Sequence, residues 1–129
     1  MSISHARADG ADAFVILLVE DDALVRYDTA EYLREAGYVV METPSGEEAI
    51  AFRKSGMLVD LVFTDINLVG AANGWDVAEC FRADRPNIPV VYASGNSSDH
   101  RQSVSGGLFI TKPYRHCDIL SACQRMRSK

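Results

Sequence analysis

Short, mostly apolar runs alternate along the chain with longer segments in which apolar residues recur at helical spacing. Each run stops abruptly at polar residues, which is the pattern of a strand buried on both faces of a parallel sheet. The runs cover residues 14–19 (FVILLV), 38–41 (YVVM), 58–64 (LVDLVFT), 90–93 (VVYA) and 108–110 (LFI). We therefore predict five strands.

The segments between these runs carry helix signals. Apolar positions from Ala23 to Ala36 follow helical spacing, and Gly37 supplies a C-terminal stop. The spacing of Ser45 and Glu48 predicts a capped helix that ends near residues 55–56.

Two further helices are predicted from one apolar face each, Trp75, Ala78 and Phe81 in the first and Ile119, Cys123 and Met126 in the second. Between residues 96 and 107 the one sizeable apolar side chain is Val104. A helix there would bury little, so we expect it to be short or loose.

Strands that alternate with helices predict a parallel sheet, because parallel strands need crossover connections. The expected class is a doubly wound α/β fold with five strands and helices on both faces. We expect residues 14–129 to form one domain and the small, polar residues 1–13 to form a flexible N-terminal leader.

Composition narrows the function further. The 129 residues are 47% hydrophobic and 24% charged, and 13 Lys and Arg face 18 Asp and Glu, a net charge of -5. This balance argues against direct DNA binding and against an anionic membrane as the main partner, since both need a basic patch. No apolar run is long enough for a membrane span or a secretory signal, so we expect a cytoplasmic protein. Three cysteines without CxxC spacing predict neither disulfides nor a zinc site.

The polar residues at the strand ends predict one shared site, because the carboxyl ends of parallel strands meet at one edge of the sheet, where such sheets bind ligands. Glu20 and Asp21 follow the first run, Asp65 the third, Ser94 the fourth and Lys112 the fifth. Two unit charges about 4 Å apart at an effective dielectric near 20 repel by roughly 4 kcal/mol. The carboxylates therefore need a positive partner, and Mg²⁺ suits an all-oxygen site better than zinc does.

This residue set predicts phosphoryl transfer onto an aspartate. Lys112 and Mg²⁺ would form a cationic frame around a phosphoryl group, and the Ser94 hydroxyl would donate to one of its oxygens.

Four motifs give the chain a resemblance to the receiver domains of bacterial two-component response regulators. They are VEDD (19–22), FTDIN (63–67), YASG (92–95) and FITKPY (109–114). All four occur in the family's order and at matching strand ends, and the resemblance covers about residues 14–127. It implies a flavodoxin-like fold with strand order 2-1-3-4-5.

The resemblance implies a role for each site residue. Asp65 would be the phosphoacceptor for a sensor histidine kinase or a histidine phosphotransfer protein. Glu20 and Asp21 would bind Mg²⁺ together with Asp65 and the backbone carbonyl of Asn67. Lys112 would pair with the phosphoryl group.

The resemblance also implies a conformational switch that signals to a downstream partner. Ser94 would be the switch hydroxyl and Phe109 the switch aromatic, which move together on phosphorylation. Asn67 and Asn96 resemble positions that tune the lifetime of the phosphorylated state. The peptide bond before Pro113 is often cis in the family.

The chain departs from the family pattern in three places. Val69 stands where a proline is usual, the loop that ends at Gly74 is about two residues longer, and the stretch from Ser94 to Lys112 is shorter. We expect a monomer or weak dimer. Because the sequence stops just after the last predicted helix, we also expect a stand-alone receiver or one excised from a hybrid kinase.

Three alternatives stay open at this point. The chain would be a phosphorelay intermediate, a degenerate receiver that only binds a partner, or a small phosphatase of the haloacid dehalogenase type. Such phosphatases place the aspartate nucleophile after the first strand, with a second Asp two residues on. Position 67 is Asn here, which removes the usual general acid/base.

Overall fold

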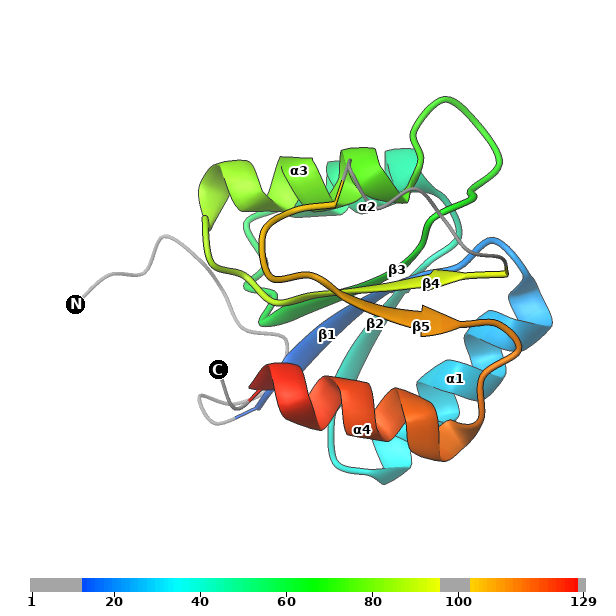
Figure 1. The fold of residues 1–129 in the computed structure, drawn as a ribbon. Coiled ribbons are helices and arrows are strands. Elements are labelled where there is room, and N and C mark those ends of the chain that lie inside the picture. Colours follow the sequence, from blue (N-terminus) through cyan, green and yellow to red (C-terminus); the bar gives the residue numbers. More distant parts are fainter. Residues whose placement is uncertain (1–12, 96–102, 128–129) are drawn as a thin grey trace.

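A computed structural model describes residues 13–95 and 103–127 and contains the predicted five-stranded parallel sheet. The strand order is β2-β1-β3-β4-β5, as predicted (Figure 1). The strands are β1 (Val15–Val19), β2 (Val39–Thr43), β3 (Leu61–Asp65), β4 (Val90–Ser94) and β5 (Leu108–Thr111). The helices are α1 (Ala23–Glu35), α2 (Gly46–Arg53), α3 (Gly74–Asp84) and α4 (His116–Arg127).

Side chains at the helix starts satisfy the first backbone amides of the helices. The Asp22 carboxylate accepts from the amides of Leu24 and Val25 before α1, and the Ser45 hydroxyl accepts from the amide of Glu48 before α2. Asn73 and Asp76 form a full capping box before α3. These caps fix where each helix begins, close to the predicted positions.

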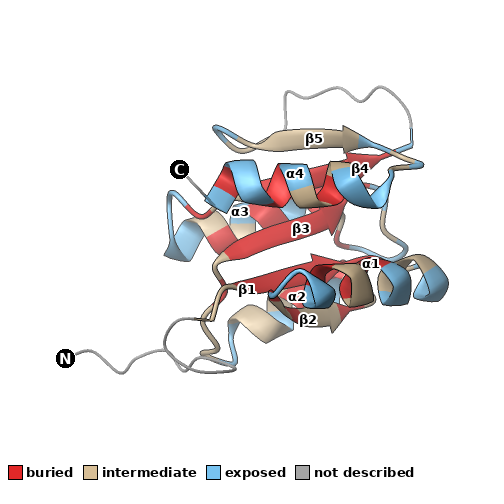
Figure 2. Ribbon diagram, turned by 90° about the horizontal axis from the view of Figure 1, so that it is seen from below, coloured by how far each residue is buried: buried red, intermediate tan, exposed pale blue. Residues whose placement is uncertain are grey.

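The sheet is covered on both faces. Helices α1 and α4 pack on one face, and α2 and α3 pack on the other (Figure 1). Strands β1, β3 and β4 are buried along their length, whereas the edge strands β2 and β5 are half-exposed (Figure 2). The apolar faces predicted for the last two helices are buried as expected, at Trp75, Ala78, Phe81, Ile119, Cys123 and Met126.

The helix expected between residues 96 and 107 falls largely on 96–102, which lie outside the described residues. The described remainder, residues 103–107, forms a turn and contains no helix.

The beginning and the end of the described fold meet at the amino end of the sheet. The guanidinium of Arg127, at the end of α4, lies 4.6 Å from the ring centroid of Phe14, just before β1. The Phe14 ring also makes an edge contact with Tyr38, with centroids 5.7 Å apart. The predicted site lies at the opposite, carboxyl end of the strands. No helix in the described part of the chain is long and apolar enough to cross a bilayer.

Candidate functional site

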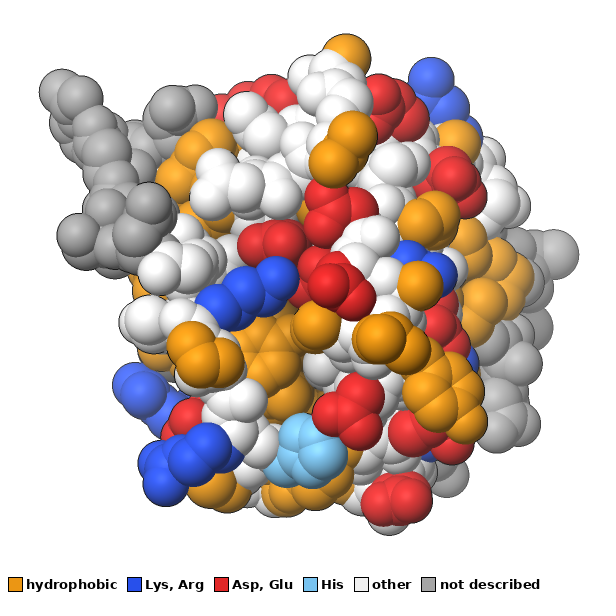
Figure 3. All heavy atoms as spheres, turned by 90° about the vertical axis from the view of Figure 1, so that its right-hand side faces the viewer, with side chains coloured by type: hydrophobic (Ala, Val, Ile, Leu, Met, Phe, Trp, Pro, Cys, Tyr) orange, Lys and Arg blue, Asp and Glu red, His pale blue; other side chains and the backbone are white. Residues whose placement is uncertain are grey.

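The carboxyl ends of the strands bring the predicted acidic residues together. Ligand oxygens of Glu20, Asp21 and Asp65 all lie within 4.8 Å of one another. Acidic side chains gather at the centre of this face, with a basic side chain directly beside them (Figure 3). Residues that lie 45 positions apart in sequence thus form one cluster because β1 and β3 are adjacent in the sheet.

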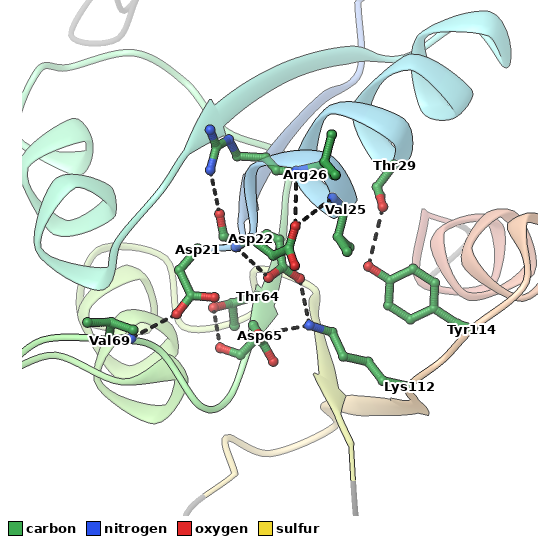
Figure 4. A network of polar contacts seen from close by, with 12 residues as sticks. Asp21, Asp22, Val25, Arg26, Thr29, Thr64, Asp65, Val69, Lys112 and Tyr114 are labelled. Atoms are coloured by element: carbon green, nitrogen blue, oxygen red, sulfur yellow. Dashed lines mark hydrogen bonds and ion pairs between the residues drawn. The ribbon is translucent and has the colours of Figure 1, made fainter.

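Lys112 reaches across the cluster and connects two of the three carboxylates (Figure 4). Its Nζ lies 2.7 Å from Oε1 of Glu20 and 2.9 Å from Oδ2 of Asp65. The Lys112 amide donates to the Ser94 carbonyl at 2.8 Å, so the end of the β4–β5 ladder fixes the lysine backbone. Burial alone would lower the pKa of Lys112, but the hydrogen bonds to Glu20 and Asp65 raise it above its ordinary value. The lysine is therefore charged at neutral pH.

Burial sets the electrostatic state of the two carboxylates that Lys112 contacts. Glu20 is 2% exposed and Asp65 is 7% exposed. Burial raises the pKa of each above its ordinary value, and the hydrogen bond from Lys112 only partly opposes this. One lysine does not neutralise three acidic groups, so the cluster favours a further cation.

Backbone contacts hold Glu20 in place. Its amide donates to the carbonyl of Thr43 at 3.1 Å, and its Oε2 accepts from the amide of Asp22 at 3.0 Å. Nη1 of Arg26 donates to the Glu20 carbonyl at 2.8 Å. The role of Arg26 was not anticipated from sequence, because its acceptor is a backbone atom that no residue pattern marks.

The loop of residues 66–74 lies against the cluster. Its Val69 amide donates to Oδ2 of Asp21 at 2.9 Å. Gly74 closes the loop by donating to the Ile66 carbonyl at 2.9 Å, and a Cβ at Gly74 would lie 2.3 Å from the carbonyl oxygen of Asp65. A glycine is therefore needed where the loop returns to the strand that carries Asp65.

The donor set fits a hard divalent cation. Three carboxylates supply oxygen ligands within reach of one centre, and Asn67 stands two residues after Asp65 in the same loop. Sulfur and imidazole ligands are absent from this described cluster, which disfavours zinc.

The two predicted switch residues lie on neighbouring strands. Ser94 ends β4 and is 5% exposed, whereas Phe109 in β5 is half-buried. The Phe109 ring stacks on Tyr92, with centroids 4.9 Å apart, and the Tyr92 hydroxyl accepts from the amide of Val104 at 3.0 Å. Asn96, the other position linked to lifetime, lies outside the described residues. The bond before Pro113 is cis.

A cavity of about 500 Å³ opens beside Lys112, between α1 and the segment that leads into α4. Tyr114 lines it and hydrogen-bonds through its hydroxyl to Thr29 at 3.3 Å. His116 lines it as well, with Nε2 2.8 Å from Oδ2 of Asp28. Tyr114 belongs to the FITKPY motif, so a signal for it was present in the sequence. The residues that line the cavity are mostly apolar or aromatic, in contrast to the acidic cluster: Leu24, Val25, Asp28, Thr29, Lys112, Pro113, Tyr114 and His116.

Comparison with known proteins gives consistent matches. The family model described as response regulator receiver domain matches residues 16–124. The two-component response regulator PhoP of Pseudomonas aeruginosa is 33% identical over 104 residues, which cover 78% of this chain and 45% of PhoP. The transcriptional regulatory protein PdtaR of Mycobacterium tuberculosis is 32% identical over 121 residues, 91% of this chain and 58% of PdtaR.

The solved structures agree with these matches. A response regulator receiver protein from Sinorhizobium medicae superposes with a TM-score of 0.88 at 32% identity, covering 92% of this chain and 98% of that one. The chain spans about half of the length of the two curated relatives but nearly all of this receiver structure.

Proposed function

Because the chain belongs to the response regulator receiver domain family and so acts in two-component signalling, we propose that Asp65 is its phosphoacceptor. The donor is the phosphohistidine of a sensor histidine kinase or of a histidine phosphotransfer protein. The observation that carries the proposal is the single cluster of Glu20, Asp21 and Asp65 with Lys112 bound across it. The family match also argues against the phosphatase alternative.

Phosphoryl transfer from histidine to Asp65 forms one bond and breaks one bond. A carboxylate oxygen of Asp65 attacks the phosphorus, a P–O bond forms, and the P–N bond to the donor imidazole breaks. The electron pair of that bond stays on the imidazole nitrogen, which takes up a proton. The Lys112 ammonium stabilises the charge that builds up on the phosphoryl oxygens.

Glu20, Asp21, Asp65 and the Asn67 carbonyl would hold Mg²⁺. The bound ion supplies positive charge that offsets the repulsion between the phosphoryl group and the acidic cluster. Asp65 must be ionised to attack, and burial raises its pKa. Lys112 favours the ionised form, so its contact with Asp65 prepares the nucleophile.

Signalling to a partner would follow from the new charge. A phosphoryl group brings about 1.5 to 2 negative charges and three acceptor oxygens, so modification offers the Ser94 hydroxyl a strong, charged acceptor. Phe109, which is paired in register with Tyr92 on the neighbouring strand, would respond to the movement of β4. Asn67, exposed beside Asp65, would tune how long the phosphoryl group persists.

The donor protein would approach Asp65 over the face shown in Figure 3. Two exposed apolar side chains lie near this approach, Val69, whose amide binds Asp21, and Leu24. Leu24 also lines the cavity beside Lys112. This surface suits a phosphodonor protein that buries apolar contacts while its phosphohistidine reaches the acidic cluster.

Phosphorylation of the purified protein tests the proposal. Incubation with Mg²⁺ and acetyl phosphate, or with a phosphorylated kinase, should add one acid-stable, base-labile phosphoryl group in intact-mass spectra. Asp65→Asn should remove the adduct. Asp22→Asn is the matched control, since it makes the same charge change nearby and asparagine still caps α1. An adduct that persists on Asp65→Asn would refute the assignment.

A further inference from the structure

The loop of residues 66–74 is held at two points. At one, the Val69 amide donates to Asp21 in the acidic cluster at 2.9 Å. At the other, the Ala71 amide donates to Oε2 of Glu47, also at 2.9 Å. Glu47 lies in the first turn of α2, which is otherwise remote from the predicted site residues in sequence. The loop therefore connects this helix to a proposed cation ligand.

Close packing reinforces the attachment to α2. A Cβ at Gly70 would lie 2.7 Å from Oε2 of Glu47, and a Cβ at Gly46 would lie 2.5 Å from the carbonyl oxygen of Ala72. Gly70 also has a φ of 111°, in the region that favours glycine. The loop backbone thus lies directly against the first turn of α2 over three consecutive residues, 70–72.

The charge of Glu47 is suited to this contact. Its hydrogen bond from the Ala71 amide lowers its pKa below the ordinary value, so the carboxylate stays ionised and remains an acceptor at neutral pH. The neighbouring Glu48 is also exposed, and its backbone amide donates to the hydroxyl of the N-cap residue Ser45. The two adjacent acids thus differ in whether the side chain is bound to the loop.

We propose that Glu47 is a positioning residue for the cation site. By holding residues 70–72, it keeps the Val69 amide in place to orient the Asp21 carboxylate and keeps the Asn67 carbonyl beside Asp65. Groups that hydrogen-bond to metal ligands fix the ligand orientation and contribute to affinity. The inference rests on the proposed Mg²⁺ site and adds α2 to the elements that build it.

Calorimetric titration with Mg²⁺ tests this role through four variants. Glu47→Ala removes the acceptor, and Glu47→Asp keeps the charge but shortens the side chain by one methylene. Glu47→Gln removes the charge but keeps an acceptor oxygen. Glu48→Ala removes a charge from the same turn without touching the loop. We expect Glu47→Ala and Glu47→Asp to weaken Mg²⁺ binding by about threefold to tenfold, less than the loss typical of a direct partner of a ligand.

The other two variants separate positioning from charge. Glu47→Gln and Glu48→Ala should bind Mg²⁺ within about twofold of the wild type, because screening at physiological ionic strength limits the effect of one exposed charge. Amide hydrogen exchange at Val69 and Ala71 in metal-free buffer supplies a second readout. It should be faster in Glu47→Ala and Glu47→Asp and unchanged in Glu47→Gln.

Two outcomes would overturn the inference. Wild-type affinity in Glu47→Asp would show that the contact does not position the site. Equal losses in Glu47→Gln and Glu48→Ala would assign the effect to charge alone. Failure of the wild type to bind Mg²⁺ would instead refute the proposed cation site itself, so the two failures are distinguishable. Should Glu47→Ala unfold, Glu47→Asp decides the question alone.

Discussion

Replacing Asp65 with asparagine should stabilise the metal-free protein, although most substitutions of buried residues destabilise. Asparagine has nearly the same shape and still offers an oxygen to Lys112, but it carries no charge. The lysine would then face Glu20 as a single compensated pair. The proposed phosphoacceptor is thus predicted to lower the stability of its own fold.

The magnitude follows from the distances in the cluster. At an effective dielectric of about 20, like charges 4.8 Å apart repel by about 3.5 kcal/mol, and Asp65 has two such neighbours within that distance. The attraction between Asp65 and Lys112, 2.9 Å apart, contributes about 6 kcal/mol at the same effective dielectric. Repulsion exceeds attraction by about 1 kcal/mol, and burial of the carboxylate adds to the difference. We expect Asp65→Asn to gain about 1–2 kcal/mol, or about 4–8 °C in melting temperature.

Urea and thermal unfolding at pH 7 in EDTA measure this gain, with Asp22→Asn as the control for the change in net charge. Mg²⁺ should reverse the order, because a ligand at 100 times its Kd stabilises the wild type by about 2.7 kcal/mol and the variant has lost one ligand. Lowering the pH should reduce the stability gain of Asp65→Asn. Because the pKa of Asp65 is raised in the folded state, the native wild type is protonated at Asp65 at a higher pH than the unfolded chain. The stability deficit of the wild type relative to Asp65→Asn is therefore relieved as the pH falls through the raised pKa towards the ordinary value of 3.8. A variant less stable than the wild type in EDTA would refute this reasoning.

Three further predictions follow from the same site. Mg²⁺ affinity measured by calorimetry should fall as pH is lowered through the raised pKa values of Glu20 and Asp65, since protons and the ion compete for the same oxygens; pH-independent affinity would contradict the ligand assignment. Lys112→Met should abolish phosphorylation and cost about 2–4 kcal/mol in urea unfolding, because it removes the cation that both buried carboxylates contact. The control Lys54→Met, at an exposed position, should change neither phosphorylation nor stability. Gly74→Ala should cost about 1–3 kcal/mol from overpacking against Asp65, and Gly95→Ala, where a Cβ meets nothing within 4 Å, should fold with wild-type stability.

The strands and their order were predictable because burial on both faces leaves a plain apolar signature. The predicted and observed strands differ at their ends. The run at 58–64 predicted a longer strand, but β3 starts at Leu61, and the Asp60 carboxylate before it accepts from the amide of Val15. The run at 38–41 underestimated β2, which extends to Thr43 as a half-exposed edge strand that tolerates the polar Glu42.

The acidic cluster was predictable for a different reason. Side chains at the carboxyl ends of parallel strands must converge, so sheet order alone brings Glu20 and Asp21 towards Asp65. The contacts of Arg26 and Glu47 were not predictable, because each side chain binds a backbone group of another segment. A backbone amide or carbonyl is present at nearly every residue, and the sequence does not mark which one is used.

The contact between Arg127 and Phe14 bears on how the domain is joined to others. Both boundaries of the described fold lie at the amino end of the sheet, and the acidic cluster lies at the other end. A neighbouring domain attached through either boundary leaves the face of Asp65 open to a phosphodonor. The same proximity means that a short linker between residues 127 and 14, with new ends in an exposed turn, should give a circular permutant that still assembles the site. The architecture therefore places both boundaries of the described fold away from the face that carries Asp65.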